Sequence, residues 1–185
     1  MRLVLTVFFS AFLTFQAQAT EIAWAKLLEG GHTILFRHAI APGTGDPANF
    51  KLDDCSTQRN LSDDGRQQAQ RIGARLAARA IKVDIVLTSQ WCRARDTAKL
   101  AFPRIPIVEN AALNSFFDDT SSKDEQTAAV IKLIEAFEGA GNQVMVTHQV
   151  NITALTGIAP REGEAIIIDV DPTGTLKVLG RQTFD

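Results

Sequence analysis

Three apolar runs of five residues, Thr33 to Arg37, Asp84 to Thr88 and Gln143 to Thr147, alternate along the chain with segments of helical spacing. Runs this short and apolar are typical of strands buried on both faces of a parallel sheet. Two further runs, Ile166 to Val170 and Thr175 to Leu179, flank the turn sequence Asp-Pro-Thr-Gly and predict an antiparallel hairpin. The pattern predicts a three-layer α/β/α sandwich whose mostly parallel sheet ends in an antiparallel edge hairpin.

The segments around these strands carry the three-and-four spacing of amphipathic helices. Ser62 is placed to cap one of them, with Asp63 and Asp64 in the first turn, and Ser122 to Glu125 has the pattern of a capping box. A brief strand at Ile107 and Val108 is expected before the last helix. The expected helices cover Glu21 to Leu28, Ser62 to Ala80, Arg93 to Ala101 and Ser122 to Glu138.

The first 19 residues have the features of a Sec-type signal peptide. Arg2 supplies a positive charge, residues 3–15 are almost wholly apolar, and Ala17-Gln18-Ala19 has small residues at the two positions that a signal peptidase reads. An apolar run of about 13 residues is shorter than the roughly 20 that span a bilayer, so cleavage after Ala19 is expected rather than a membrane anchor. The expected organisation is a signal peptide at 1–19 and one domain at 20–185, periplasmic or secreted, with no stable membrane span.

Export changes the interpretation of Cys55 and Cys92, because thiols can pair in an oxidising compartment. A disulfide between them encloses 36 residues, for which the chain-entropy model gives about 3 to 4 kcal/mol. The alternatives are two free thiols or half of a metal site, but the sequence has no CxxC, HxH or HExxH spacing, so no metal or other cofactor is expected. Without residues 1–19 the chain has 18 Lys and Arg against 21 Asp and Glu, a net charge of −3, and nothing in it suggests a nucleic-acid partner.

Cationic and imidazole side chains follow the expected strands at the points where the strands end. Arg37 and His38 close the first strand, Arg93 lies shortly after the second, and His148 follows the strand at 143–147. The carboxyl ends of parallel strands meet at one sheet edge, where α/β proteins hold their ligands. Guanidinium groups match phosphate oxygens bidentately, and a neutral imidazole can attack phosphorus. These residues predict a site for phosphoryl chemistry.

Four segments carry a more specific pattern. LFRHA at 35–39 stands where an RHG motif would be, and RNLSDDGRQQA at 59–69 matches R-x-L-(S/T)-x-x-G-x-x-Q-A. TSQWCRARDTA at 88–98 is similar to S-S-x-x-x-R-A-x-x-T-A, and VTH at 146–148 completes the series. In these segments and their order the chain resembles the histidine phosphatase superfamily, which includes cofactor-dependent phosphoglycerate mutases and small phosphohistidine phosphatases. The resemblance implies a phosphoglycerate mutase-like fold.

Carried over residue by residue, the resemblance implies His38 as the nucleophile, Arg37 and Arg93 as phosphate ligands, and His148 as the second histidine of the pocket. Arg59 matches an arginine that some small members use as a further phosphate ligand. The alternative role for Arg59 is that of a solvated side chain, or of one paired with Asp63 or Asp64. Arg95 is expected to face away from the site and to be structural, and His32 to be an ordinary exposed or hydrogen-bonded residue.

The chain departs from the family at the general acid. Many members have a glutamate in an L-x-E context after the third strand, and Ser115 stands at that position here. Proton donation to the leaving oxygen is worth about 10² to 10⁴-fold, so its source matters. Asp118 or Asp119 is the preferred candidate. The alternatives are a solvated loop at these two positions, an acid from the loop at 41–55 (Asp46, Asp53 or Asp54), or a substrate with a good leaving group.

Together with the signal-like segment at 1–19, the resemblance implies an exported phosphatase that hydrolyses phosphomonoesters through phospho-His38 and needs no metal. Among small exported members the chain is similar to the bacterial Ais group, which is associated with phosphates of the lipopolysaccharide core. The substrate is expected to be a small-molecule or envelope phosphomonoester, selected by the loops at 41–55 and 114–121. The alternative is a non-catalytic module that binds phosphate or a phosphorylated ligand without turnover, a reading that the missing glutamate supports.

Overall fold

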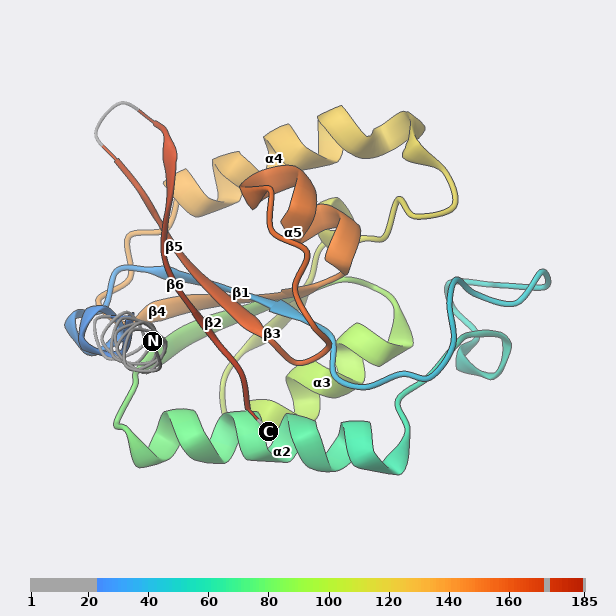
Figure 1. Ribbon diagram of the computed structural model, residues 1–185, viewed down its shortest axis with the longest axis horizontal. Helices are drawn as coiled ribbons and strands as arrows, with labels where there is room; N and C mark the ends of the chain where they lie inside the picture. Colours follow the sequence, from blue (N-terminus) through green and yellow to red (C-terminus); the bar gives the residue numbers. More distant parts are fainter. Residues whose placement is uncertain (1–22, 172–173, 185) are drawn as a thin grey trace, which may run out of the picture.

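The computed structural model describes residues 23–171 and 174–184 as one α/β sandwich (Figure 1). A six-stranded sheet has the order β3-β2-β4-β1-β5-β6, in which β1 to β4 are mutually parallel and β5 and β6 run antiparallel to their neighbours. The expected three-layer sandwich with an antiparallel edge hairpin is therefore confirmed. The expected signal peptide at 1–19 lies outside the described residues.

The bounds of the elements follow the expected ones closely. Residues 23–29 are helical. The strands are β1 (Thr33–Arg37), β2 (Val83–Thr88), β3 (Ile107–Glu109), β4 (Asn142–Thr147), β5 (Ala165–Val170) and β6 (Leu176–Gln182). The α-helices are α2 (Asp63–Ala78), α3 (Cys92–Ala101), α4 (Lys123–Glu135) and α5 (Gln149–Thr156), and short 3-10 turns are η1 (Cys55–Thr57), η2 (Ala111–Leu113) and η3 (Thr120–Ser122).

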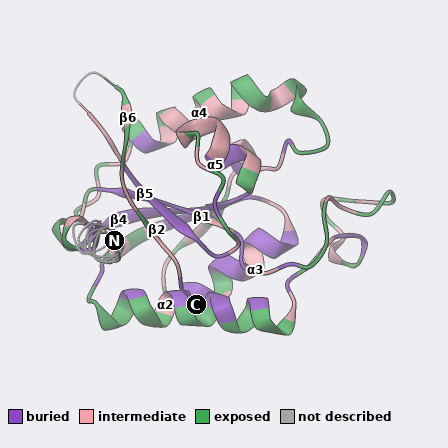
Figure 2. Cartoon of the chain, viewed as in Figure 1, coloured by how far each residue is buried: buried purple, intermediate pink, exposed green. Residues whose placement is uncertain are grey.

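The sheet separates two hydrophobic cores because successive side chains of a strand point to opposite faces. In β1, Ile34 and Phe36 pack with α2, α3 and the helix at 23–29, whereas Leu35 packs with α4 and α5. The central strands are buried on both faces (Figure 2). Their side chains are fixed by packing, so the residues that follow their carboxyl ends start from a rigid base.

One local prediction was wrong, and one helix was not predicted. Ser122 makes no capping hydrogen bond to α4 and belongs instead to η3, where Asp119 accepts from the Ser121 amide at 2.9 Å. The helix α5 was not predicted, because it begins directly after His148 without a capping side chain and is only eight residues long. The cap on α2 is confirmed: the Ser62 hydroxyl accepts from the Gly65 amide at 3.0 Å.

Candidate active site

His38 follows β1 at the carboxyl edge of the sheet and lines a pocket of about 160 Å³. Its Nδ1 lies 2.8 Å from the carbonyl oxygen of Ala39. Because a carbonyl oxygen only accepts hydrogen bonds, Nδ1 carries the proton, and Nε2 of the neutral ring has a free lone pair. Burial lowers the pKa of His38 well below its ordinary value, and the positive charge of Arg93 lowers it further. The imidazole is therefore neutral and suited to act as a nucleophile.

His148 follows β4, the strand beside β1, and lies opposite His38 with 5.5 Å between the ring centroids. Its Nε2 is 2.9 Å from the Ser89 hydroxyl, which fixes the ring, and its Nδ1 has no hydrogen-bond partner among the described residues. Burial, followed by the electrostatic effects of His38 and Arg93, lowers its pKa well below the ordinary value. The two imidazoles thus share a pocket, and one nitrogen of each ring is held by a protein group, Ala39 for His38 and Ser89 for His148.

Three arginines, Arg37, Arg59 and Arg93, line the same pocket. Arg37 is held by Gln149 Oε1 and the Pro160 carbonyl, both at 3.1 Å from Nη1. Its Nε and that of Arg93 are buried without a hydrogen-bond partner in the described chain. Glu162 lies within ion-pair distance of two of these arginines, 3.5 Å from Arg37 and 3.7 Å from Arg59.

Arg59 does not pair with Asp63 or Asp64 in the part of the chain described, where Asp63 pairs with Arg66. Its guanidinium instead donates to the backbone carbonyls of Ala41 and Gly45, the second at 2.9 Å. The residue therefore shapes the loop after β1 while it lines the pocket.

Asp46 lies at the centre of this loop and is bound on every side. Its Oδ1 accepts from Arg93 Nη1 at 2.8 Å and from the Arg59 amide at 3.0 Å, and its Oδ2 accepts from the Trp91 indole at 3.0 Å. Burial raises the pKa of the Asp46 carboxyl, but the hydrogen bonds from Arg93, Arg59 and Trp91 outweigh burial and hold it below its ordinary value. Asp46 is thus an ionised partner of Arg93, not a proton donor.

The structure separates the two preferred acid candidates. Asp118 lines the pocket, and a methyl group added to Gly45 would lie 3.7 Å from Asp118 Oδ1, so the carboxyl group borders the loop after β1. Asp119 is engaged as the cap of η3 and does not line the pocket. Ser115, at the position of the family's glutamate, lines the pocket with its hydroxyl near the Phe117 amide at 3.3 Å.

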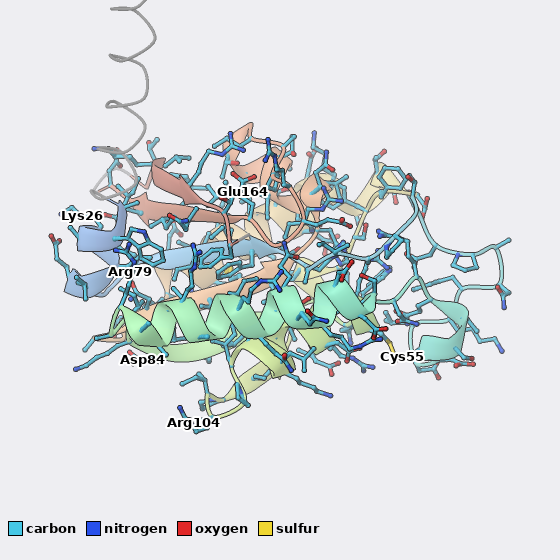
Figure 3. The ribbon with its side chains drawn as sticks, turned by 60° about the horizontal axis from the view of Figure 1, so that its bottom comes forward. Lys26, Cys55, Arg79, Asp84, Arg104 and Glu164 are labelled. Atoms are coloured by element: carbon cyan, nitrogen blue, oxygen red, sulfur yellow. A yellow bond between two sulfur atoms is a disulfide. The ribbon has the colours of Figure 1, made fainter. Side chains whose placement is uncertain are left out.

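The disulfide between Cys55 and Cys92 is formed, as expected (Figure 3). It joins η1 to the first residue of α3, directly before Arg93. The Arg95 guanidinium lies 3.2 Å from both sulfur atoms and 3.5 Å from Glu109, and it does not line the pocket. His32 is also away from the pocket, with Nδ1 3.7 Å from Asp169.

The remaining motif residues hold the backbone that follows His38. A Cβ on Gly65 would lie 2.0 Å from the Ile40 carbonyl oxygen, so only glycine allows α2 to approach so closely. Gln68 accepts from the Ile40 amide at 3.1 Å, and Thr97 of α3 accepts from the Ala39 amide at 2.9 Å. Two helices thus fix the turn that carries the nucleophile candidate.

Sequence reasoning missed several residues of this site. Asp46 was considered only as an acid, and Glu162, Phe117 and Ser89 were not singled out. The spacing of Asp46 from Arg93 gives no local signal, because the two residues are 47 positions apart. Among the described residues no cluster of three or more histidine, cysteine and acidic side chains is arranged to hold a metal ion.

Solved structures with the same fold include the protein histidine phosphatase SixA complexed with tungstate, with 16% identity, a TM-score of 0.59 and coverage of 82% of this chain and 96% of that one. A putative alpha-ribazole-5'-P phosphatase from Escherichia coli has 17% identity, a TM-score of 0.61 and coverage of 84% and 96%. The fold is thus that of a phosphoglycerate mutase-like α/β protein.

Residues 34–117 match the model of the histidine phosphatase superfamily, branch 1. The mitochondrial serine/threonine-protein phosphatase Pgam5 of Drosophila melanogaster is 32% identical over 97 residues. That match covers 52% of this chain but only 31% of the fly protein.

Proposed function

We propose that the protein is a phosphatase that hydrolyses phosphomonoesters through a phosphohistidine intermediate on His38. The observation that carries the proposal is the neutral imidazole of His38, with Nδ1 on the Ala39 carbonyl, in a pocket with three arginines and a second imidazole. Preorganised cations of this kind stabilise the charge on a transferring phosphoryl group. The similarity to SixA and Pgam5, which are phosphatases by name, supports the same chemistry.

The reaction has two steps. His38 Nε2 attacks phosphorus, the bond from phosphorus to the leaving oxygen breaks, and the Asp118 carboxylic acid gives its proton to that oxygen. A water molecule then attacks the phosphohistidine, the phosphorus-nitrogen bond breaks, and the water proton passes to the Asp118 carboxylate. Arg37, Arg93 and Arg59 hold the phosphoryl oxygens, with His148 lining the same pocket. Inorganic phosphate leaves and the site is restored.

We also propose that the protein acts outside the cytoplasm, periplasmic or secreted, on small-molecule or envelope phosphomonoesters. The features that support export are the signal-like segment at 1–19 and the disulfide. Within the described residues no helix has the length and apolarity to cross a membrane. Fusion of residues 1–22 to a reporter that is active only after export tests this proposal, with an Arg2→Glu variant as the control.

Acid-labile labelling tests the mechanism. The protein is mixed with 4-nitrophenyl phosphate carrying labelled phosphorus and quenched within its first turnovers, and the label is expected on His38 and absent from a His38→Ala variant. A His32→Gln variant, altered outside the pocket, is the matched control and keeps the label. Binding of inorganic phosphate with no labelled histidine, and no hydrolysis that depends on His38, would instead identify a phosphate-binding module without turnover.

A further inference from the structure

The residues that line the pocket fall into two chemical groups. The first group consists of the histidines and arginines, together with Asp46. The other side chains of the lining are Thr44, Ser115, Phe117, Asp118, Gln149 and Val150. This second group contains one aromatic ring and one acid and no lysine or arginine, so it can contact the part of a substrate other than its phosphoryl group.

Phe117 is the distinctive residue of this second group. It is 51% exposed although its neighbour Phe116 is buried in the protein. The other large hydrophobic side chains that are exposed in the described residues, Leu28, Val108 and Val178, do not line the pocket. An apolar surface beside a few convergent polar groups is typical of a ligand site. The exposed ring is therefore available to contact a substrate.

Phe117 and Asp118 present their side chains to the same side of the pocket. A methyl group on Gly45 would lie 4.0 Å from Phe117 Cε1 and 3.7 Å from Asp118 Oδ1, so the ring and the carboxyl group border one point of the loop after β1. A leaving oxygen that receives a proton from Asp118 has its substituent next to the Phe117 ring. Aromatic rings pair favourably in offset or edge-to-face arrangements, so an aromatic substituent on this oxygen can pack against Phe117.

The charges of the pocket favour a neutral leaving group. Each arginine already has a carboxylate nearby: Asp46 is 2.8 Å from Arg93, and Glu162 is 3.5 Å from Arg37 and 3.7 Å from Arg59. One phosphoryl group can use the remaining donors of the three guanidinium groups. A second anionic group on the substrate would have no further lysine or arginine of the pocket lining to pair with, because these three arginines are the only cationic side chains in the described lining.

We infer that the substrates are monophosphate esters of uncharged aromatic alcohols, and that Phe117 is the residue that selects them. This inference rests on the proposed phosphatase function and names the substrate class of the same site. The feature that the site recognises is the aromatic ring of the leaving group, and the phosphoryl group is held as already described.

Benzyl phosphate and n-butyl phosphate test the inference, because both release a primary alcohol of comparable acidity and differ in the ring. We expect kcat/KM to be about tenfold higher for benzyl phosphate, equivalent to about 1.4 kcal/mol. In Phe117→Ala the ratio of the two values is expected to fall to near 1, and in Phe117→Leu to an intermediate value. Val108→Ala, which removes exposed apolar surface outside the pocket, is the matched control and keeps the wild-type ratio.

The outcomes are distinguishable. Equal kcat/KM for the two esters in the wild type, or an unchanged ratio in Phe117→Ala, overturns the inference and leaves the phosphatase function intact. No hydrolysis of either ester, together with no label on His38, overturns the proposed function itself. A third ester, 4-carboxybenzyl phosphate, is expected to react more slowly than benzyl phosphate, and an equal or faster reaction would overturn the preference for an uncharged leaving group.

Discussion

The Asp46 carboxylate and the Arg93 guanidinium form a buried ion pair, with 2.8 Å between Oδ1 and Nη1 and side chains that are only 6% and 3% exposed. The pair joins the loop after β1 to α3, and the Trp91 indole completes it. Removal of one member of a buried pair leaves the other charge without compensation in a poorly solvated site. Asp46 is therefore a positioning residue for Arg93.

We expect Asp46→Asn to lower kcat/KM by about 10²-fold, because a displacement of a phosphate-binding group near 1 Å has an effect of that order. The free energy of unfolding is expected to fall by about 3 kcal/mol, the lower end of the range for breaking a buried pair. Steady-state kinetics and urea unfolding measure the two effects. Asp63→Asn is the control, since the pair of Asp63 with Arg66 is exposed, and a similar loss in that variant would contradict the role of Asp46.

The disulfide also joins the segment that follows β1 to α3. Cys55 belongs to η1 and Cys92 begins α3, and Gln58 bridges them further by accepting from the Cys92 amide at 2.9 Å. Reduction is expected to lower activity more than helix content, because the two core clusters of the sandwich include neither η1 nor the disulfide. Activity and far-ultraviolet circular dichroism, measured with and without dithiothreitol, compare the two. A Cys55→Ser/Cys92→Ser variant, insensitive to the reductant, is the control, and equal activity in both redox forms would refute the prediction.

The sheet could be predicted from the sequence because short apolar runs such as that of β1 have few other ways to be buried. The strand ends, and with them Arg37, His38 and His148, followed from the parallel arrangement. The contacts of Asp46 could not be predicted, since they depend on how a loop of more than ten residues closes over α3. The contacts of Glu162 could not be predicted for the same reason, because both of its arginine partners lie more than 100 positions away in the sequence.

The two imidazoles predict how stability depends on pH. The pKa values of His38 and His148 in the folded protein lie well below 6.5, chiefly because both rings are buried. As the pH falls below about 6.5, the unfolded chain takes up protons that the folded protein does not, so the free energy of unfolding decreases. Each such histidine contributes at most about 1.4 kcal/mol per pH unit. Urea unfolding between about pH 7.5 and pH 5 measures this slope, which is expected to be shallower in His148→Gln; an identical slope in both proteins would disprove the prediction.

The position of Asp118 predicts an effect that depends on the leaving group. Proton donation matters most for esters whose alcohol is a poor leaving group and least for 4-nitrophenyl phosphate. Asp118→Asn is therefore expected to lower kcat about 10² to 10⁴-fold for n-butyl phosphate and by less than about tenfold for 4-nitrophenyl phosphate. Asp119→Asn, altered at the cap of η3, is the control for a change of charge in this loop. Equal losses on both esters in Asp118→Asn would show that the residue is not the proton donor.

Two glycines of α2 allow the placement of His38 and the stability of the fold to be tested separately. A Cβ at Gly65 would lie 2.0 Å from the Ile40 carbonyl oxygen, and a Cβ at Gly73 would lie 2.0 Å from that of Ala101. Both Gly65→Ala and Gly73→Ala are expected to lower the free energy of unfolding by about 1 to 3 kcal/mol, because each forces backbone apart in a packed interface.

Of the two displaced carbonyl groups, only that of Ile40 is close to His38, two residues along the chain. We therefore expect Gly65→Ala to lower kcat/KM about tenfold or more under conditions where the variant is fully folded. The kcat/KM of Gly73→Ala is expected to stay close to that of the wild type. Thermal unfolding establishes the folded fraction, and kinetics at a temperature well below both midpoints gives the comparison. If the two variants lose activity equally, the contact of Gly65 with Ile40 serves the stability of the domain and not the placement of His38.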